Sequence, residues 1–140
     1  MVVAQPPAGA LSVRVLAGRK AGAASALAAD IDSFCKEAVA LNAAANGVEV
    51  GFTDTDLLDS APPEADLILA GDICYEKPLA QRVMDWLEAA RAQGSTVLIG
   101  DPGRTYFPRQ GLVKMAEYQV PTTRELEDME VKKTAVWALP

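Results

Sequence analysis

The fold is decided by the stretch Ala-Asp-Leu-Ile-Leu-Ala-Gly-Asp-Ile-Cys-Tyr-Glu at residues 65–76 and by the segments that follow it. Residues 65–70 read as a strand that is apolar on both faces at its end, a pattern typical of parallel sheets covered by helices on both sides. Apolar residues then recur at helical spacing over 78–93, and a second apolar strand is predicted over 95–100. Strand, helix and strand in this order predict a β-α-β unit.

The same alternation extends toward the N-terminus. Strands are predicted at 26–29 and 48–52, and a helix at 33–46 lies between them. Strands separated by helical patterns indicate a mostly parallel sheet. The fold class predicted is therefore α/β, with residues 1–140 forming one domain.

The C-terminal part predicts a different arrangement. Residues 110–117 are predicted as a helix, and 118–124 and 131–139 as two strands. The link between these strands is too short for a helical crossover, so we expect antiparallel neighbours at one edge of the sheet.

Composition excludes several classes of function. The chain has 140 residues, 13 Lys and Arg against 19 Asp and Glu, a net charge of −6 and no histidine. The acidic balance argues against nucleic acid as the principal partner. The absence of histidine excludes Ser-His-Asp catalysis and histidine-based metal sites. No metal site is predicted.

The cysteines and the apolar segments predict where the protein works. Cys35 and Cys74 form no metal-binding spacing and each sits in an apolar stretch, so we expect buried free thiols in a reducing compartment. No apolar run reaches the ~18 residues of a membrane span, and no secretory signal is evident. A cytoplasmic protein without a membrane partner is expected.

Acidic residues follow three of the predicted strands. Ligands of open α/β sheets bind beyond the carboxyl ends of the strands. Asp30 stands where an acid accepts hydrogen bonds from ribose hydroxyls; the alternative is that Asp30 or Asp32 only caps the next helix. Asp54 and Asp56 can hold the exocyclic amino group of a purine, or lie in a solvated loop.

The third group of polar residues forms an Asp-x-x-Tyr pattern. Asp72 and Tyr75 come directly after the strand at 65–70, so the acid faces the ligand crevice. The alternative for Asp72 is a cap for the helix that begins near Pro78. A fourth strand end carries Asp101-Pro102-Gly103-Arg104, which predicts a type II turn.

Five motifs follow one another along the chain: Ala-Ala-Asp-Ile-Asp (28–32), Leu-Asn-Ala-Ala-Ala-Asn (41–46), Gly-Asp-Ile-Cys-Tyr-Glu (71–76), Leu-Ile-Gly-Asp-Pro-Gly-Arg (98–104) and Thr-Ala-Val-Trp (134–137). The chain is similar to the lysine methyltransferases of the electron-transfer flavoprotein β subunit, within the class I, S-adenosylmethionine-dependent seven-strand group that carries an Asp-x-x-Tyr motif. The resemblance rests on these five motifs together and covers about residues 21–140.

The resemblance implies a Rossmann-like seven-strand methyltransferase fold and S-adenosylmethionine as cofactor. It also implies a protein substrate, the electron-transfer flavoprotein β subunit, whose neutral lysine amine attacks the sulfonium. The residues that it assigns to cofactor binding are Asp30, Ile31, Asp54 and Gly71, and those that it assigns to catalysis are Asp72 and Tyr75.

The N-terminus departs from this family, which has a first strand that ends in a Gly-x-Gly-x-Gly loop. Ala21-Gly22-Ala23 matches the family, but no such loop precedes it, so the first strand and the loop are predicted to be missing or altered. A shifted reading frame over residues 1–20, or an alternative start, is one hypothesis for this. Leu11–Ala17 is the candidate for the missing strand, but too few residues follow it for a helical crossover. We therefore expect residues 1–20 to pack irregularly, the chain to be marginally stable and the cofactor to bind weakly.

Three alternative functions stay open at this stage. The missing loop favours a methyltransferase-like remnant that binds cofactor poorly. A small-molecule enzyme of the nicotinamide type and a ribosomal-protein methyltransferase are the others. The sequence does not determine the oligomeric state.

Overall fold

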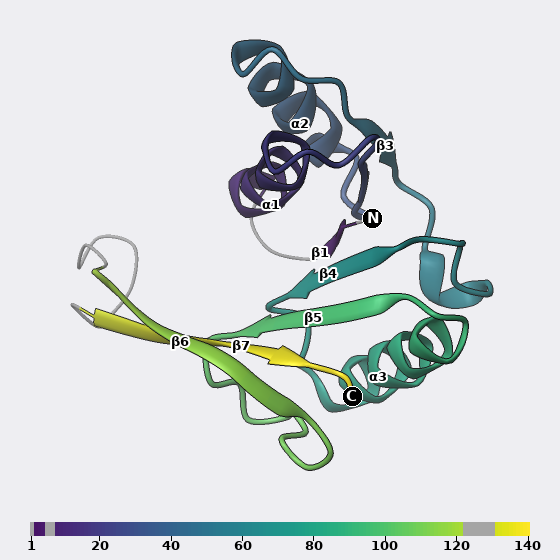
Figure 1. The fold of residues 1–140 in the computed structure, drawn as a ribbon, viewed down its shortest axis with the longest axis vertical. Helices are drawn as coiled ribbons and strands as arrows, with labels where there is room; N and C mark the ends of the chain where they lie inside the picture. The colour runs from purple at the N-terminus through teal and green to yellow at the C-terminus, as the bar shows by residue number, and fades with distance from the viewer. Residues whose placement is uncertain (1, 5–7, 122–130) are drawn as a thin grey trace.

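The computed structural model describes residues 2–4, 8–121 and 131–140, which form alternating strands and helices (Figure 1). The strands are β1 (Val2–Ala4), β2 (Leu27–Ala29), β3 (Gly51–Thr53), β4 (Leu67–Gly71), β5 (Thr96–Asp101), β6 (Val113–Pro121) and β7 (Val131–Ala138). The helices are α1 (Ala8–Lys20), α2 (Phe34–Ala45), α3 (Lys77–Ala92) and the 3-10 helix η1 (Leu57–Asp59). The predicted order of strands and helices from residue 26 to residue 101 is confirmed.

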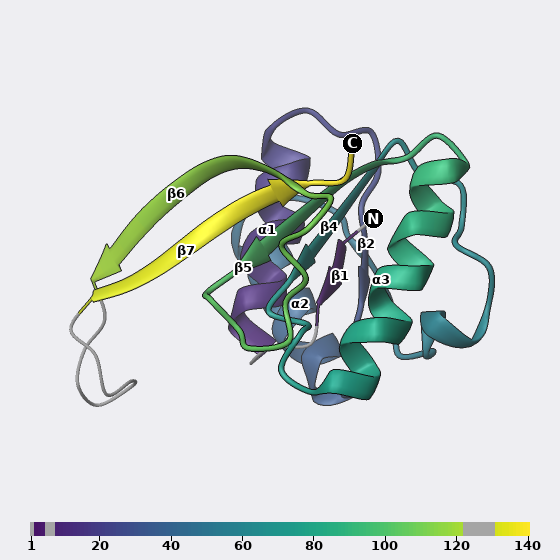
Figure 2. The same ribbon diagram turned by 90° about the horizontal axis from the view of Figure 1, so that it is seen from below.

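The described strands form one seven-stranded sheet with the order β3-β2-β1-β4-β5-β7-β6. The strands from β3 to β5 in this order pair in parallel, whereas β7 pairs antiparallel with both β5 and β6. The prediction of a mostly parallel sheet with an antiparallel C-terminal edge is therefore confirmed. In Figures 1 and 2 the far ends of β6 and β7 extend well beyond the other strands.

Helices cover both faces of the parallel part of the sheet. Figures 1 and 2 show α1 and α2 on one face and α3 on the other. One side of α3 is buried against β4 and β5 because its apolar residues recur every three or four positions. The indole Nε1 of Trp86 donates to the Ser60 carbonyl at 3.0 Å, which ties α3 to the loop after η1.

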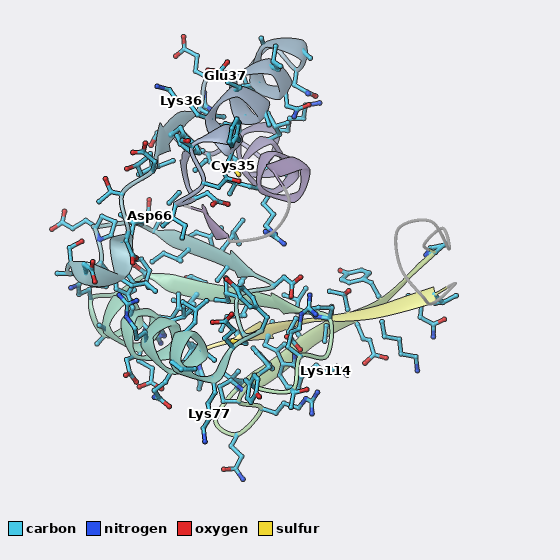
Figure 3. The ribbon with its side chains drawn as sticks, turned by 180° about the vertical axis from the view of Figure 1, so that it is seen from behind. Cys35, Lys36, Glu37, Asp66, Lys77 and Lys114 are labelled. Atoms are coloured by element: carbon cyan, nitrogen blue, oxygen red, sulfur yellow. The ribbon has the colours of Figure 1, made fainter. Side chains whose placement is uncertain are left out.

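The opposite face is closed by α1 and α2. Leu11 and Val15 of α1 are fully buried and pack with Cys35 and Val39 of α2. Figure 3 shows Cys35 turned inward and its neighbours Lys36 and Glu37 turned toward solvent. Cys35 and Cys74 are both free and buried, as predicted.

The N-terminal segment is more regular than the sequence predicted. Leu11–Ala17, the candidate for the missing strand, is not a strand, because these residues lie inside α1. The first strand is present in short form: β1 has three residues, Val2–Ala4, and lies between β2 and β4. Placing the strand there leaves the whole of α1 for the crossover to β2, which removes the shortage of connecting residues. The expectation of irregular packing was therefore wrong for residues 2–4 and 8–20, while residues 1 and 5–7 lie outside the described residues.

The predicted helix over 110–117 was also wrong. Residues 113–121 form β6, which pairs along its length with β7 and contains an irregularity between Lys114 and Ala116. A short apolar segment fits a helix or a strand equally well by periodicity, and here the pairing with β7 decides. Of the predicted strand at 118–124, residues 118–121 belong to β6 and 122–124 lie outside the described residues.

Candidate active site

The register of the parallel strands brings the predicted polar residues to one edge of the sheet. Ala29 at the end of β2 pairs with Thr53 of β3 and with Val3 of β1, while Ala4 of β1 pairs with Gly71 of β4. Asp30 and Asp72 therefore leave the sheet on either side of the end of β1. This edge is the place where ligands of such sheets bind.

Asp30 is a buried carboxylate with one unused oxygen. Its side chain is 5% exposed, and Oδ1 accepts a hydrogen bond from the Asp32 backbone N–H at 2.9 Å. Oδ2 is buried and has no hydrogen-bond partner among the described residues, and the nearest thiol is that of Cys35, whose pKa is raised to about 11 by burial first and then by its contact with Asp30. An unsatisfied buried acceptor is costly, so this oxygen is available to a ligand that carries hydroxyl donors.

Asp32 has the capping role that was the alternative for both acids. Its Oδ1 accepts a hydrogen bond from the backbone N–H of Phe34, the first residue of α2, at 2.9 Å. Asp30 is therefore left as the acid of this pair with a buried carboxylate oxygen that no described hydrogen bond uses.

A pocket opens beside Asp30. It is open to solvent, and apolar side chains from η1 and α3 form much of its wall. The lining residues are Ala29, Asp30, Ile31, Thr55, Asp56, Leu57, Leu58, Ile73, Leu79 and Val83. An apolar pocket with a few polar groups at one end suits a flat heterocycle joined to a polar sugar.

The structure separates Asp54 from Asp56. Asp54 follows β3 and is exposed, and it does not line this pocket. Asp56 lines the pocket, caps η1 by accepting a hydrogen bond from the Leu58 N–H at 3.0 Å, and lies 3.6 Å from Arg82. Ile31 also lines the pocket while 56% of its surface stays exposed, so it forms part of the mouth.

Asp72 is held in a strained conformation by its neighbours. Its φ of 55° lies in the left-handed region, where no other non-glycine residue of the described chain is found. The backbone N–H donates to the Gly100 carbonyl at 2.9 Å, and both carboxylate oxygens accept from Arg104, at 2.6 Å from Nε and 2.8 Å from Nη2. Strain of this kind persists only where the surroundings enforce it, and it concentrates at functional sites.

The Asp72–Arg104 pair excludes the alternative role of Asp72 as a helix cap. The residue at the cap position of α3 is Glu76, and its side chain makes no capping hydrogen bond. Asp72 uses its carboxylate on Arg104 instead, across 32 residues of sequence.

Asp101 fixes the turn that supplies Arg104. It is 4% exposed, and its carboxylate accepts hydrogen bonds from the backbone N–H groups of Gly103, at 2.7 Å, and Arg104. Gly103 has a φ of 95°, which fits the third position of the predicted type II turn. Burial raises the pKa of Asp101, and the two backbone hydrogen bonds oppose that rise.

Tyr75 lies in the electrostatic field of both acids. Its pKa is raised by burial first, and then by the negative charges of Glu76, Asp30 and Asp72. The ring is 38% exposed, so one side of it is open to an approaching molecule. Tyr75 therefore stands at the same edge as Asp30 and Asp72.

Two arginines of this site received no role from the sequence. Arg104 lies in the Asp-Pro-Gly-Arg motif, and Arg14 lies within Leu11–Ala17, the candidate for the missing strand. The backbone of Gly71 touches the Arg14 side chain, since an added Cβ would lie 2.4 Å from its Cζ. In a chain of net charge −6, an arginine directly after the Asp-Pro-Gly turn could have been predicted to pair with an acid of the site. The position of Arg14 could not be predicted in this way, because it depends on α1, which the sequence analysis did not identify as a helix.

Comparisons with known proteins show which sequences and folds this chain is similar to. No protein-family model matches the chain. The chain is 33% identical over 128 residues to the electron transfer flavoprotein beta subunit lysine methyltransferase of Rattus norvegicus and 34% identical to that of Danio rerio. These matches cover 87% of this chain and 50% of each relative, so the chain spans about half the length of the curated relatives that it matches.

Solved structures show the same fold. TrmN from Thermus thermophilus matches with a TM-score of 0.62 at 22% identity, covering 100% of this chain and 44% of that one. The N-methyltransferase NodS from Bradyrhizobium japonicum, in complex with S-adenosyl-L-homocysteine, matches with a TM-score of 0.64 at 13% identity, covering 99% and 76%.

The described residues contain neither a candidate metal cluster nor a candidate membrane-spanning helix. No group of three acidic or cysteine side chains there is arranged to hold a metal ion. None of the described helices has the length and hydrophobicity that a membrane crossing requires.

The fold is that of the class I methyltransferases, and the sequence is similar, over half their length, to the electron transfer flavoprotein beta subunit lysine methyltransferases.

Proposed function

We propose that this chain is an S-adenosylmethionine-dependent protein-lysine N-methyltransferase and that its substrate is the β subunit of an electron-transfer flavoprotein. The observation that carries the proposal is the unused, buried Oδ2 of Asp30, which stands beside an apolar pocket and on the same edge as Asp72 and Tyr75. The relatives' names supply the substrate.

The pocket residues fit the adenosine part of the cofactor. Asp30 would accept hydrogen bonds from the ribose hydroxyls, and Ile31 would cover one face of the adenine at the pocket mouth. Asp56 is the acid that lines the pocket, so we propose that it, with Asp54 nearby, receives the exocyclic amino group. When bound, the cofactor supplies an electrophilic methyl group on a sulfonium.

Asp72 and Tyr75 would handle the incoming lysine. Lysine has a pKa of about 10.4 and must lose a proton before it attacks. The Asp72 carboxylate by itself favours the ammonium form, and the positive charge of Arg104 and Arg14 beside it reduces that preference. Each carboxylate oxygen has a second lone pair, so Asp72 can accept an amine N–H while it holds Arg104. The half-exposed Tyr75 ring would align the side chain.

A direct substrate comparison tests the function. The full chain is incubated with methyl-labelled S-adenosylmethionine and, in separate reactions, the flavoprotein β subunit, nicotinamide and ribosomal protein L11. We expect label on lysine residues of the β subunit, located by mass spectrometry of its peptides. Transfer to nicotinamide or to the ribosomal protein instead would overturn the substrate assignment.

The impaired remnant is the alternative that a sequence feature favours, since residues 5–9 read Gln-Pro-Pro-Ala-Gly where the family has its Gly-rich loop. Isothermal titration with S-adenosylhomocysteine separates it from the proposed enzyme. Measurable binding and turnover support the enzyme, whereas absence of both identifies a remnant.

The adenine contact gives a matched pair of variants. Asp56→Asn should weaken S-adenosylhomocysteine binding by about 3- to 10-fold, because it removes a charged acceptor from the pocket wall while its remaining oxygen can still cap η1. Asp54→Asn, two residues away and exposed, should change the affinity less. Titration of both variants decides, and a larger loss for Asp54→Asn would move the contact to that residue.

A further inference from the structure

The side chain of Arg14 reaches from α1 to the carboxyl end of β4. An ideal Cβ on Gly71 would lie 2.4 Å from the Arg14 Cζ and Nη2 atoms and 2.8 Å from Nε. The guanidinium therefore rests directly on the Gly71 backbone, in space that any other residue at position 71 would occupy. The φ of Gly71 is not positive, so backbone conformation does not require a glycine at this position. The close approach of the Arg14 side chain does require one.

This guanidinium has a donor that nothing in the described chain uses. Nη1 of Arg14 is buried and has no hydrogen-bond partner among the described residues. Burial lowers the pKa of Arg14, and the negative charge of Asp72 opposes that effect. Arginine stays charged in proteins, and an unpaired buried N–H of a charged group is costly. The arrangement therefore favours an anion with an oxygen acceptor at this point.

The anion site and the ribose site are separated by a defined distance along the sheet edge. Asp30 follows β2 and Gly71 ends β4, and β1 lies between these two strands. Neighbouring strands are about 4.8 Å apart, so the two positions are separated by about 10 Å. If the ribose of a ligand binds Asp30, the far end of the substituent on that ribose would reach Arg14.

We propose that Arg14 binds the α-carboxylate of the cofactor's amino-acid arm. The inference rests on the proposed function and adds to it a residue that anchors the methionine end. It gives this chain a side-chain contact to the carboxylate where the sequence of residues 5–9 has no Gly-rich loop. Charge-assisted hydrogen bonds between arginine and carboxylate are among the stronger polar contacts, and the arginine fork selects planar carboxylates.

The test uses two ligands that differ in this arm. S-adenosylhomocysteine carries the carboxylate, whereas 5′-methylthioadenosine has the same adenosine and sulfur but no amino-acid arm. Titration calorimetry measures both ligands on the wild-type chain and on Arg14→Gln and Arg14→Lys. Lys20→Gln, which removes an exposed charge from the same helix, is the matched control.

We expect Arg14→Gln to weaken S-adenosylhomocysteine by about tenfold or more and 5′-methylthioadenosine by less than about twofold. Arg14→Lys should give an intermediate loss, because lysine keeps the charge without the fork. Gly71→Ala should reproduce the selective loss, since its Cβ displaces the guanidinium. The control should bind both ligands as the wild-type chain does.

The same titrations show whether the Arg14 inference fails or the proposed function fails. An equal loss for both ligands, no loss, or tighter S-adenosylhomocysteine binding in Arg14→Gln would show that Arg14 does not hold the carboxylate. If neither ligand binds the wild-type chain, the proposed function fails instead. Should Arg14→Gln not fold, the methyl ester of S-adenosylhomocysteine provides the same comparison on the wild-type chain, and equal affinity for ester and acid would contradict the inference.

Discussion

Replacing Asp72 with asparagine should lower the rate of methyl transfer at saturating cofactor by about 100-fold or more, the loss typical of a mispositioned reactant. Asparagine keeps the shape of the side chain and tolerates the left-handed φ of 55°, so the backbone at the end of β4 should be preserved. It removes the negative charge that would hold the target amine. The measurement is kcat from label transfer to the flavoprotein β subunit, with S-adenosylhomocysteine affinity measured in parallel.

The controls separate a role in turnover from a role in folding. Asp66→Asn removes an exposed acid at the opposite end of the same strand segment and should leave kcat unchanged (Figure 3). Arg104→Gln leaves the Asp72 carboxylate in place but removes its bidentate partner, so its loss should be smaller than that of Asp72→Asn. If Asp72→Asn binds cofactor normally and retains kcat within about threefold of wild type, Asp72 does not act on the amine.

The parts of the fold that could be predicted are those in which periodicity and burial coincide. The segment from residue 65 to residue 101 carries two apolar strands and an amphipathic helix, and β4, α3 and β5 appear within two residues of the predicted bounds. The antiparallel edge followed from the shortness of one link. Each of these inferences rests on a local sequence pattern, and the structure has the element that the pattern predicts.

The errors occurred where pairing with distant residues decides the structure. Val2–Ala4 is too short to be recognised as a strand, yet its place between β2 and β4 makes it one. Leu11 and Val15 lie four residues apart and are both fully buried, which is helical spacing, whereas the sequence analysis considered Leu11–Ala17 only as a strand. Residues 113–121 became a strand through pairing with β7.

In the candidate site, too, some features follow from local sequence and others depend on residues that are distant in the sequence. The positions of Asp30 and Asp72 followed from the rule that ligands bind at the carboxyl ends of parallel strands. The pair between Asp72 and Arg104 spans 32 residues and requires the coordinates of two turns, so no local pattern predicts it. The choice between Asp54 and Asp56 likewise depends on the course of the loop into η1, which directs Asp56 toward the pocket.

Asp30→Ala should weaken S-adenosylhomocysteine binding by about 1.5–3 kcal/mol, the range for hydrogen bonds to a charged group, which is about a 10- to 150-fold rise in Kd. The change removes the unused Oδ2 that lies buried beside the pocket. It also removes the acceptor of the part-buried hydrogen bond from the Asp32 N–H at 2.9 Å, and because Asp32 itself is exposed, water can take the place of that acceptor. Isothermal titration measures the affinity, and thermal melting without ligand measures stability.

The two measurements together distinguish a ligand-binding acid from a structural one. A buried acceptor without a partner destabilises the ligand-free chain, so its removal should leave the melting temperature unchanged or raise it while affinity falls. Asp32→Asn is the control, because asparagine caps a helix as well as aspartate does and should alter neither quantity. Unchanged affinity in Asp30→Ala would show that the ribose lies elsewhere. A lower melting temperature with unchanged affinity would instead make Asp30 a support for the turn into α2.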